Sequence, residues 1–322
     1  MDRRAYYTYL RMQKEQDPSL EVEDWQVDDY RCMDLQTLFS LLEDQDISLD
    51  KQSFLRIAES HETPEQMTDD LVDDVDEALW DRIYLLIFEL WRRLVPEKLS
   101  LPLFCDELDH QILIYDQNGP VNQEAIGDAF AHFEMVLDEN LDAGADVREV
   151  FATISDEMAN DLESFLFDYI SEQIDLGNES FSQELIEIFG PCVEGSKWFE
   201  VLKVRLIARK NLAEAERQSG RLVEMTVQDE DLEFVMEVLY TLVQGGDSKS
   251  FKKVAKHASS LIETEQDLQD LLEVSADFFN CMDCEAEEKR VNQAIAARQS
   301  RTLDQKVDMS DPELQDLFSE MF

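Results

Sequence analysis

The chain has 322 residues, 74 of them acidic and 28 basic, and its formal net charge is -46 at pH 7. Because 44% of the residues are hydrophobic, the chain can bury a core, and its acidity does not indicate disorder. So negative a charge repels nucleic-acid phosphates and anionic lipid headgroups. It disfavours direct binding to nucleic acid or to a membrane and favours a basic protein partner. Acidity that serves only solubility or adaptation to salt is the competing interpretation.

Turn-forming residues are scarce, with 9 glycines and 7 prolines. Sheets need many tight turns, whereas long helices joined by short loops need few. The sequence therefore predicts an all-α fold of stacked helical hairpins, a right-handed α-solenoid. We expect an irregular arm or short helix over residues 1–27, an acidic helical domain over 28–195, helical repeats over 196–299, and a linker with a docking helix over 300–322.

Cysteine usage and hydropathy indicate the compartment. The five cysteines are odd in number and scattered, which favours reduced thiols over a disulfide framework. The first residues contain no apolar run of the kind found in secretory signals. We therefore expect a cytoplasmic protein that does not insert into membranes; the oligomeric state is left open.

An acidic stretch without a basic residue lies between His61 and Asp76. Four of its carboxylates are the predicted contacts to a basic partner: Asp69, Asp70, Asp73 and Asp74. Pro64 is typical of a first helical turn, and this helix is expected to run into the apolar stretch Leu79–Val95 and to stop at Pro96. Charged residues interrupt that stretch, which is too short to span a bilayer, so it predicts a buried central helix.

Oxygen-bearing side chains follow Leu137 at calcium-loop spacing. They occupy places one, three, five and twelve of such a loop: Asp138, Asn140, Asp142 and Glu149. Ala143 stands at the sixth place, where the loop needs glycine. The competing prediction is a helix that ends near Asp142, with a new helix capped by Asp146 after Gly144.

The region after Ser196 is repetitive. Residues 231–262 align with 267–298 at a shift of 36 residues, so that Leu232 matches Leu268 and Ala258 matches Ala294. Each copy predicts a helix, a turn and a second helix. This unit resembles a degenerate tetratricopeptide repeat, although the family's diagnostic Trp, Gly and closing Pro are missing. The resemblance covers residues 196–298 and implies an array that binds peptides or proteins.

Basic residues gather in the same region. Residues 196–221 contain seven bases against three acids, and a second group lies at i, i+3, i+4 and i+7, on one predicted helix face. This second group consists of Lys249, Lys252, Lys253 and Lys256. Either these bases neutralise neighbouring acidic helices, or they line a groove for an acidic or C-terminal carboxylate segment of a partner.

The last residues predict a short amphipathic helix. Ser310 is a predicted cap, Pro312 fits the first turn, and apolar residues follow at helical spacing: Leu314, Leu317, Phe318, Met321 and Phe322. So short a helix is unstable alone in water. It must dock on its own chain or in a groove of another protein.

Reactive motifs are sparse. No glycine-rich phosphate cradle and no HExxH pattern occur, the four histidines are scattered, and Cys281 and Cys284 form a single CxxC without a second pair for zinc. We therefore predict no catalytic, cofactor or metal site. The predicted function is a non-catalytic adaptor, scaffold or chaperone-like binder of a basic protein. The alternative is an acidic nucleic-acid mimic that inhibits a DNA- or RNA-binding protein.

Overall fold

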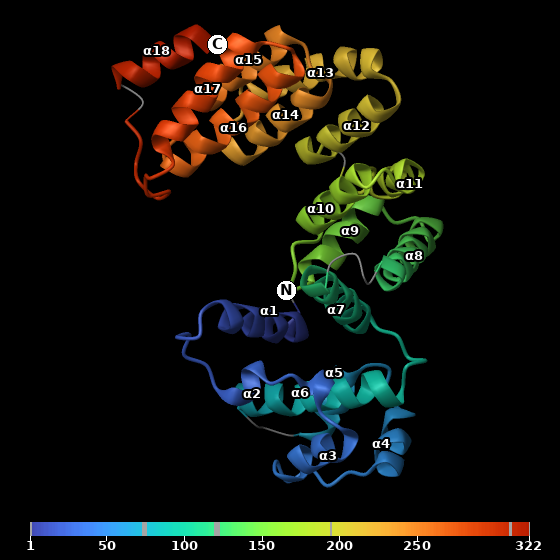
Figure 1. Cartoon of the computed structure of the whole chain (residues 1–322). Helices are drawn as coiled ribbons and strands as arrows, with labels where there is room; N and C mark the ends of the chain where they lie inside the picture. The colour runs from blue at the N-terminus through green and yellow to red at the C-terminus, as the bar shows by residue number, and fades with distance from the viewer. Residues whose placement is uncertain (1, 73–75, 119–122, 194, 309–310, 322) are drawn as a thin grey trace. The chain divides into compact units, whose positions relative to one another are not determined.

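The computed structural model describes residues 2–72, 76–118, 123–193, 195–308 and 311–321. Over these residues the fold is all-α, as predicted, and an isolated bridge between Thr264 and Lys306 is the single β-type pairing described. No helix over the same residues is long and apolar enough to cross a membrane. Contacts divide the chain into two compact units, Met1–Phe165 and Leu166–Phe322, so the predicted boundary at Ser196 lies inside the second unit (Figure 1).

The helices of the first unit are α1 (Arg3–Gln16), α2 (Asp24–Val27), the 3-10 turn η1 (Tyr30–Cys32), α3 (Leu35–Glu43), α4 (Lys51–Ala58), α5 (Pro64–Leu71), α6 (Glu77–Leu94), α7 (Leu101–Asn118), α8 (Gln123–Asp142) and α9 (Val147–Asp156). Helix α10 (Leu162–Asp175) crosses the division. Helix α6 is the centre of its first part, where it packs against α3, α4 and α5. Its residues Ile83–Trp91 are all buried, which confirms the predicted central helix.

Two expectations for this unit need correction. Residues 1–27 were expected as an arm or a short helix, but α1 is a 14-residue helix, capped by Asp2 and packed on α7. Its buried face mixes the polar Arg4 and Thr8 with Ala5 and Tyr7, so the apolar stripe that would have predicted it is interrupted. The helix that starts at Pro64 does not run into the central helix, since α5 ends at Leu71 and α6 begins at Glu77.

Buried ion pairs tie α1 and η1 to α7. Asp106 accepts a hydrogen bond from Arg4 Nε at 2.7 Å and another from an Arg31 guanidinium nitrogen at 2.5 Å. Burial alone would raise the pKa of Asp106, but the two guanidinium groups lower it to about 2. One turn further along, burial raises the pKa of Asp109 to about 6, against three N–H donors from Ala159 and Asn160.

The helices wholly within the second unit are α11 (Glu179–Phe189), α12 (Lys197–Lys210), α13 (Leu212–Thr226), α14 (Leu232–Gly245), α15 (Ser248–Ala258), α16 (Glu265–Cys281), α17 (Glu285–Arg298) and α18 (Pro312–Met321). Helices α12–α17 form three successive antiparallel pairs, as the 36-residue alignment predicts for the last two. Helix α14 contacts both α12 and α16, and Figure 1 shows α14, α16 and α17 lying side by side.

Aromatic packing fixes the last pairs. The rings of Phe251 and Phe278 stack with centroids 3.8 Å apart, and Phe279 meets both rings edge-on. After α17 the chain returns along the start of α16, where the amides of Glu265 and Gln266 donate to carbonyl oxygens of residues 305 and 303. Residues 299–308 are therefore fastened to the unit by backbone hydrogen bonds.

Candidate functional site

The acidic stretch is partly engaged by its own unit. Asp69 accepts a hydrogen bond from the Trp80 indole at 2.9 Å, and Asp70 lies 2.7 Å from Nε2 of His61. Both aspartates are nevertheless exposed. Asp73 and Asp74 lie outside the described residues. The two described carboxylates thus connect α5 to neighbouring segments while leaving oxygen atoms open to solvent.

His61 gives the arrangement closest to a catalytic group. Its Nδ1 lies 2.8 Å from the Ile57 carbonyl oxygen and 3.2 Å from Ser60 Oγ. A carbonyl oxygen only accepts, so Nδ1 must carry the proton in that bond and cannot take one from Ser60. Burial opposes protonation of the ring, yet Asp70 and Ile57 raise the pKa of His61. The ring is held as a structural link and Ser60 is not activated.

The calcium-like spacing falls on a helix. Residues 138–142 are the last turn of α8, and the Asn140 amide donates to the Val136 carbonyl oxygen. Gly144 follows with a φ of +90°, and Asp146 caps α9 through its bond to the Arg148 amide. The helix–turn–helix alternative is therefore confirmed. Over the described residues, no group of three His, Cys, Asp or Glu side chains is placed to hold a metal ion.

Most of the basic residues in 196–221 are neutralised within the second unit. Lys197 pairs with Asp229 and Asp231 at 2.9 and 3.0 Å. Arg205, whose side chain is 8% exposed, pairs with Asp175 and Glu237. For these bases the intramolecular interpretation is confirmed.

The second basic group differs. Lys249, Lys253 and Lys256 are exposed and Lys252 is half-buried, all on α15. Over the residues that the structure describes, no carboxylate lies within ion-pair distance of these four lysines. They are placed as the spacing predicts, on one helix face, and they form no ion pair with a described carboxylate.

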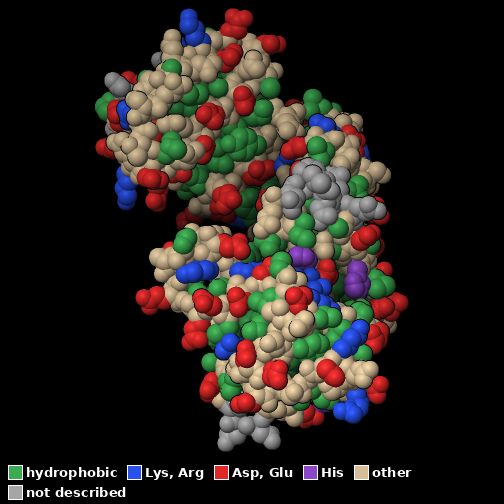
Figure 2. Space-filling view, turned by 60° about the horizontal axis from the view of Figure 1, so that its bottom comes forward, with side chains coloured by type: hydrophobic (Ala, Val, Ile, Leu, Met, Phe, Trp, Pro, Cys, Tyr) green, Lys and Arg blue, Asp and Glu red, His purple; other side chains and the backbone are tan. Residues whose placement is uncertain are grey.

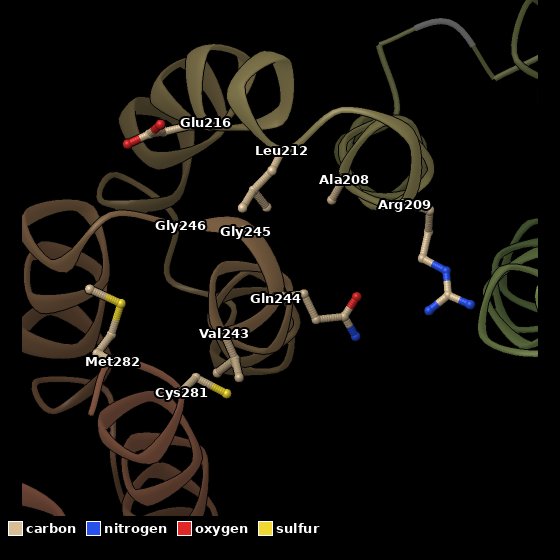
Figure 3. A pocket seen from close by; sticks show the side chains of 10 residues that line it. All are labelled: Ala208, Arg209, Leu212, Glu216, Val243, Gln244, Gly245, Gly246, Cys281 and Met282. Atoms are coloured by element: carbon tan, nitrogen blue, oxygen red, sulfur yellow. The ribbon is translucent and has the colours of Figure 1, made fainter. Parts of the chain in front are cut away.

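A pocket of about 520 Å³ opens where α12, α14 and α16 end and α13 begins. Leu212, Val243 and Met282 supply apolar walls, and Gly245 and Gly246 lie between them (Figure 3). Leu212 is 57% exposed and Met282 is 44% exposed, so the pocket presents apolar surface to solvent. No motif in the sequence predicts this pocket. The signal available was the 36-residue alignment, which matches Gly245-Gly246 with Cys281-Met282 and so places two turns at one end of the pairs.

The charged groups at the rim turn outward. Figure 3 shows the Arg209 guanidinium and the Glu216 carboxylate pointing away from Leu212. A Cβ built on Gly177 would lie 3.7 Å from an Arg209 guanidinium nitrogen, which places that group near the turn before α11. With these charged groups turned outward, the inner wall of the pocket is mainly apolar.

The terminal helix is formed as predicted over Pro312–Met321. Leu314 is 5% exposed and Met321 is 1% exposed, while Leu317 and Phe318 are half-buried. Phe322 and the predicted cap Ser310 lie outside the described residues. Because the chain's own residues bury Leu314 and Met321, α18 docks on its own chain in this structure.

Acidic side chains spread over much of the face seen in Figure 2, among apolar and uncharged ones. Comparisons of the chain with protein-family models, with curated proteins and with solved structures found no match. The candidate sites are therefore argued from their own geometry.

Proposed function

We propose that the chain is a non-catalytic protein-binding module, a helical-repeat adaptor, scaffold or chaperone-like binder of a basic partner. One observation carries the proposal: the pocket at the shared end of three helix pairs, walled by half-exposed Leu212 and Met282. Four separate helices supply its lining, so it is an opening in the array and not a gap beside one side chain.

Apolar walls and an acidic surface have separate roles in such binding. Covering Leu212 and Met282 with a partner side chain removes apolar surface from water, at about 25 cal/mol per Å². The net charge of -46 attracts a basic partner over a longer range and speeds encounter more than it adds affinity. The surface charge would thus attract the basic partner, and the pocket would bind one of its apolar side chains.

The arrangement of α12–α17 supports a tetratricopeptide-like interpretation. Each pair packs internally, and α14 also packs on α12, α13 and α16. A pair of helices cannot bury both of its faces, so neighbouring pairs share a core. Arrays of this kind present their inter-pair surfaces to peptides, and the proposed pocket lies on such a surface.

Affinity capture with the full chain tests the proposal. We compare the native protein, a Leu212→Asp/Met282→Asp variant and a Leu303→Asp control, since Leu303 is 47% exposed in the same unit but outside the pocket. A partner bound through the pocket is retained by the native chain and the control at about 0.5 M salt, and is lost from the pocket variant.

The same experiment identifies the alternative. A nucleic-acid mimic binds through carboxylates, so its partner would be released between about 0.05 and 0.5 M salt. That partner would bind the pocket variant as well as the native chain. If the partner is released by salt and binds the Leu212→Asp/Met282→Asp variant as well as the native chain, nucleic-acid mimicry replaces the proposed function.

A further inference from the structure

Helix α15 has two chemically opposite faces. Phe251, Val254, Ala255 and Ala258 are 0% exposed and hold it against the core of the second unit. The opposite face is the lysine face, which consists of Lys249, Lys252, Lys253 and Lys256. Because the buried face fixes the helix, the lysine face is displayed at a fixed register.

Lys256 lies in the last turn of α15, where the helix dipole favours a cation, but the rest of the lysine face is less favourable for the helix. Lysines three and four residues apart repel each other, and Lys249 lies in the first turn, where the helix dipole disfavours a cation. Several other bases of this unit are paired, as Lys197 and Arg205 are. The chain has 74 acidic residues, yet these four adjacent lysines form no ion pair in its described part. Their ammonium groups are therefore open to carboxylates of a partner.

We propose that the lysine face of α15 is an interaction surface for a short acidic segment of another protein. The segment would present carboxylates at helical spacing, so that several meet the four ammonium groups together. This goes beyond the proposed pocket, because the partner chemistry is opposite and the residues are different. Lys252 is already oriented, with its Nζ 6.0 Å from the Phe279 ring centroid.

Charge favours a short acidic segment over other anions. At physiological salt, charges act over about 8 Å, so a short segment is attracted by the lysines it touches. A long nucleic acid would extend over the acidic surface of a chain with net charge -46. A second copy of the chain would bring the same net charge with it.

The test uses the full chain and three labelled probes at about 0.15 M salt. The first is a helical peptide of about 15 residues with glutamates at i, i+3, i+4 and i+7. In the second peptide each glutamate is replaced by glutamine. The third probe is single-stranded DNA of equal charge, and binding is followed by fluorescence anisotropy.

Two variants with equal charge change make the assignment specific. The first replaces the lysine face: Lys249→Gln, Lys252→Gln, Lys253→Gln and Lys256→Gln. The control replaces four exposed bases that form no ion pair in the described part of the chain: Lys51→Gln, Arg56→Gln, Lys289→Gln and Lys306→Gln. Circular dichroism checks folding, and the single Lys253→Gln variant serves if the fourfold one unfolds.

We expect the glutamate peptide to bind the native chain and the control within twofold of each other, and the glutamine peptide not to bind. The lysine-face variant should bind the glutamate peptide at least about tenfold more weakly, and Lys253→Gln about twofold more weakly. Equal loss in both fourfold variants, absence of binding, or DNA binding as tight as the peptide's would overturn the proposal. The proposal would also be overturned if the native chain and the control were dimers and the lysine-face variant alone were a monomer.

Discussion

Each of the two units contains its own buried ion pairs, and these differ in the sequence separation of their partners. In the first unit Asp106 joins Arg4 and Arg31, which are 102 and 75 positions away in sequence. In the second unit the pairs Arg205–Glu237 and Arg298–Glu265 span 32 and 33 positions, about one helix pair. A local, repeating pattern can be read from sequence and forms early in folding, whereas distant pairs require the whole unit to assemble.

The largest effect expected from this difference is in the first unit. Asp106→Asn leaves the Arg4 guanidinium buried without a countercharge, so the unit should lose about 3–5 kcal/mol of stability. Hydrogen exchange followed by mass spectrometry should show the loss in residues 3–165 and not in the helix pairs of the second unit. The double variant Arg4→Met/Asp106→Leu should recover much of it; a loss as large in the double variant would contradict this account of the buried pair.

A smaller effect is expected from the aromatic stack of the second unit. Phe278→Leu keeps an apolar side chain but removes the ring stacked 3.8 Å from Phe251. We expect a loss of about 1–2 kcal/mol, measured by exchange in α15 and α16. Tyr240→Leu, at a 45% exposed position, is the control and should change stability little.

Two glycines of the second unit differ in their surroundings, one at the end of α14 and one inside α13. A Cβ on Gly246 would lie 2.8 Å from the Leu242 carbonyl oxygen, so Gly246→Ala should cost about 1 kcal/mol and narrow the pocket. A Cβ on Gly220, within α13, meets nothing within 4 Å. Gly220→Ala should therefore stabilise the second unit by about 0.5–1 kcal/mol. Thermal unfolding measures the change in stability in both variants. A change of the same sign in both would refute the predicted difference.

The pH dependence of the first unit gives a change of similar size. The pKa of Asp109 is about 6 in the folded chain, above its ordinary 3.8, so the folded state binds this proton more tightly. Its contribution to stability is greatest below pH 4 and declines as the pH rises through about 6. Between pH 5 and 7 the loss should be about 1 kcal/mol, and Asp109→Asn should remove that slope from exchange rates in α7.

The sequence predicts the helices better than it predicts their contacts. Apolar spacing and stop residues are local signals, and they place the central helix that ends before Pro96 and the repeated pairs around Gly245 and Met282. Residues 1–27 are predicted only as an arm or a short helix because α1 buries Arg4 and Thr8, and the partner of Arg4 lies on α7. A buried charge is understood only with its partner.

The candidate sites show the same limit. The register of Lys249 and Lys253 follows from helical spacing alone, but whether a carboxylate faces them depends on which helices are neighbours. Lys197 and Lys249 both lie in the first turn of a helix. Of these two, Lys197 forms an ion pair in the described structure and Lys249 does not. The pocket at Leu212 and Met282 is formed by residues about 70 positions apart, so no local sequence pattern predicts it.

The return of residues 303–307 along the start of α16 has a consequence for biosynthesis. The amides of Glu265 and Gln266, and the carboxylate of Glu265, find their partners in residues 298–305. At about 5–20 residues per second, a ribosome takes roughly 2–8 s to add those 40 residues. During that interval the amides of Glu265 and Gln266 must bond to water, and the Glu265 carboxylate has Gln269 but not yet Arg298 as a partner.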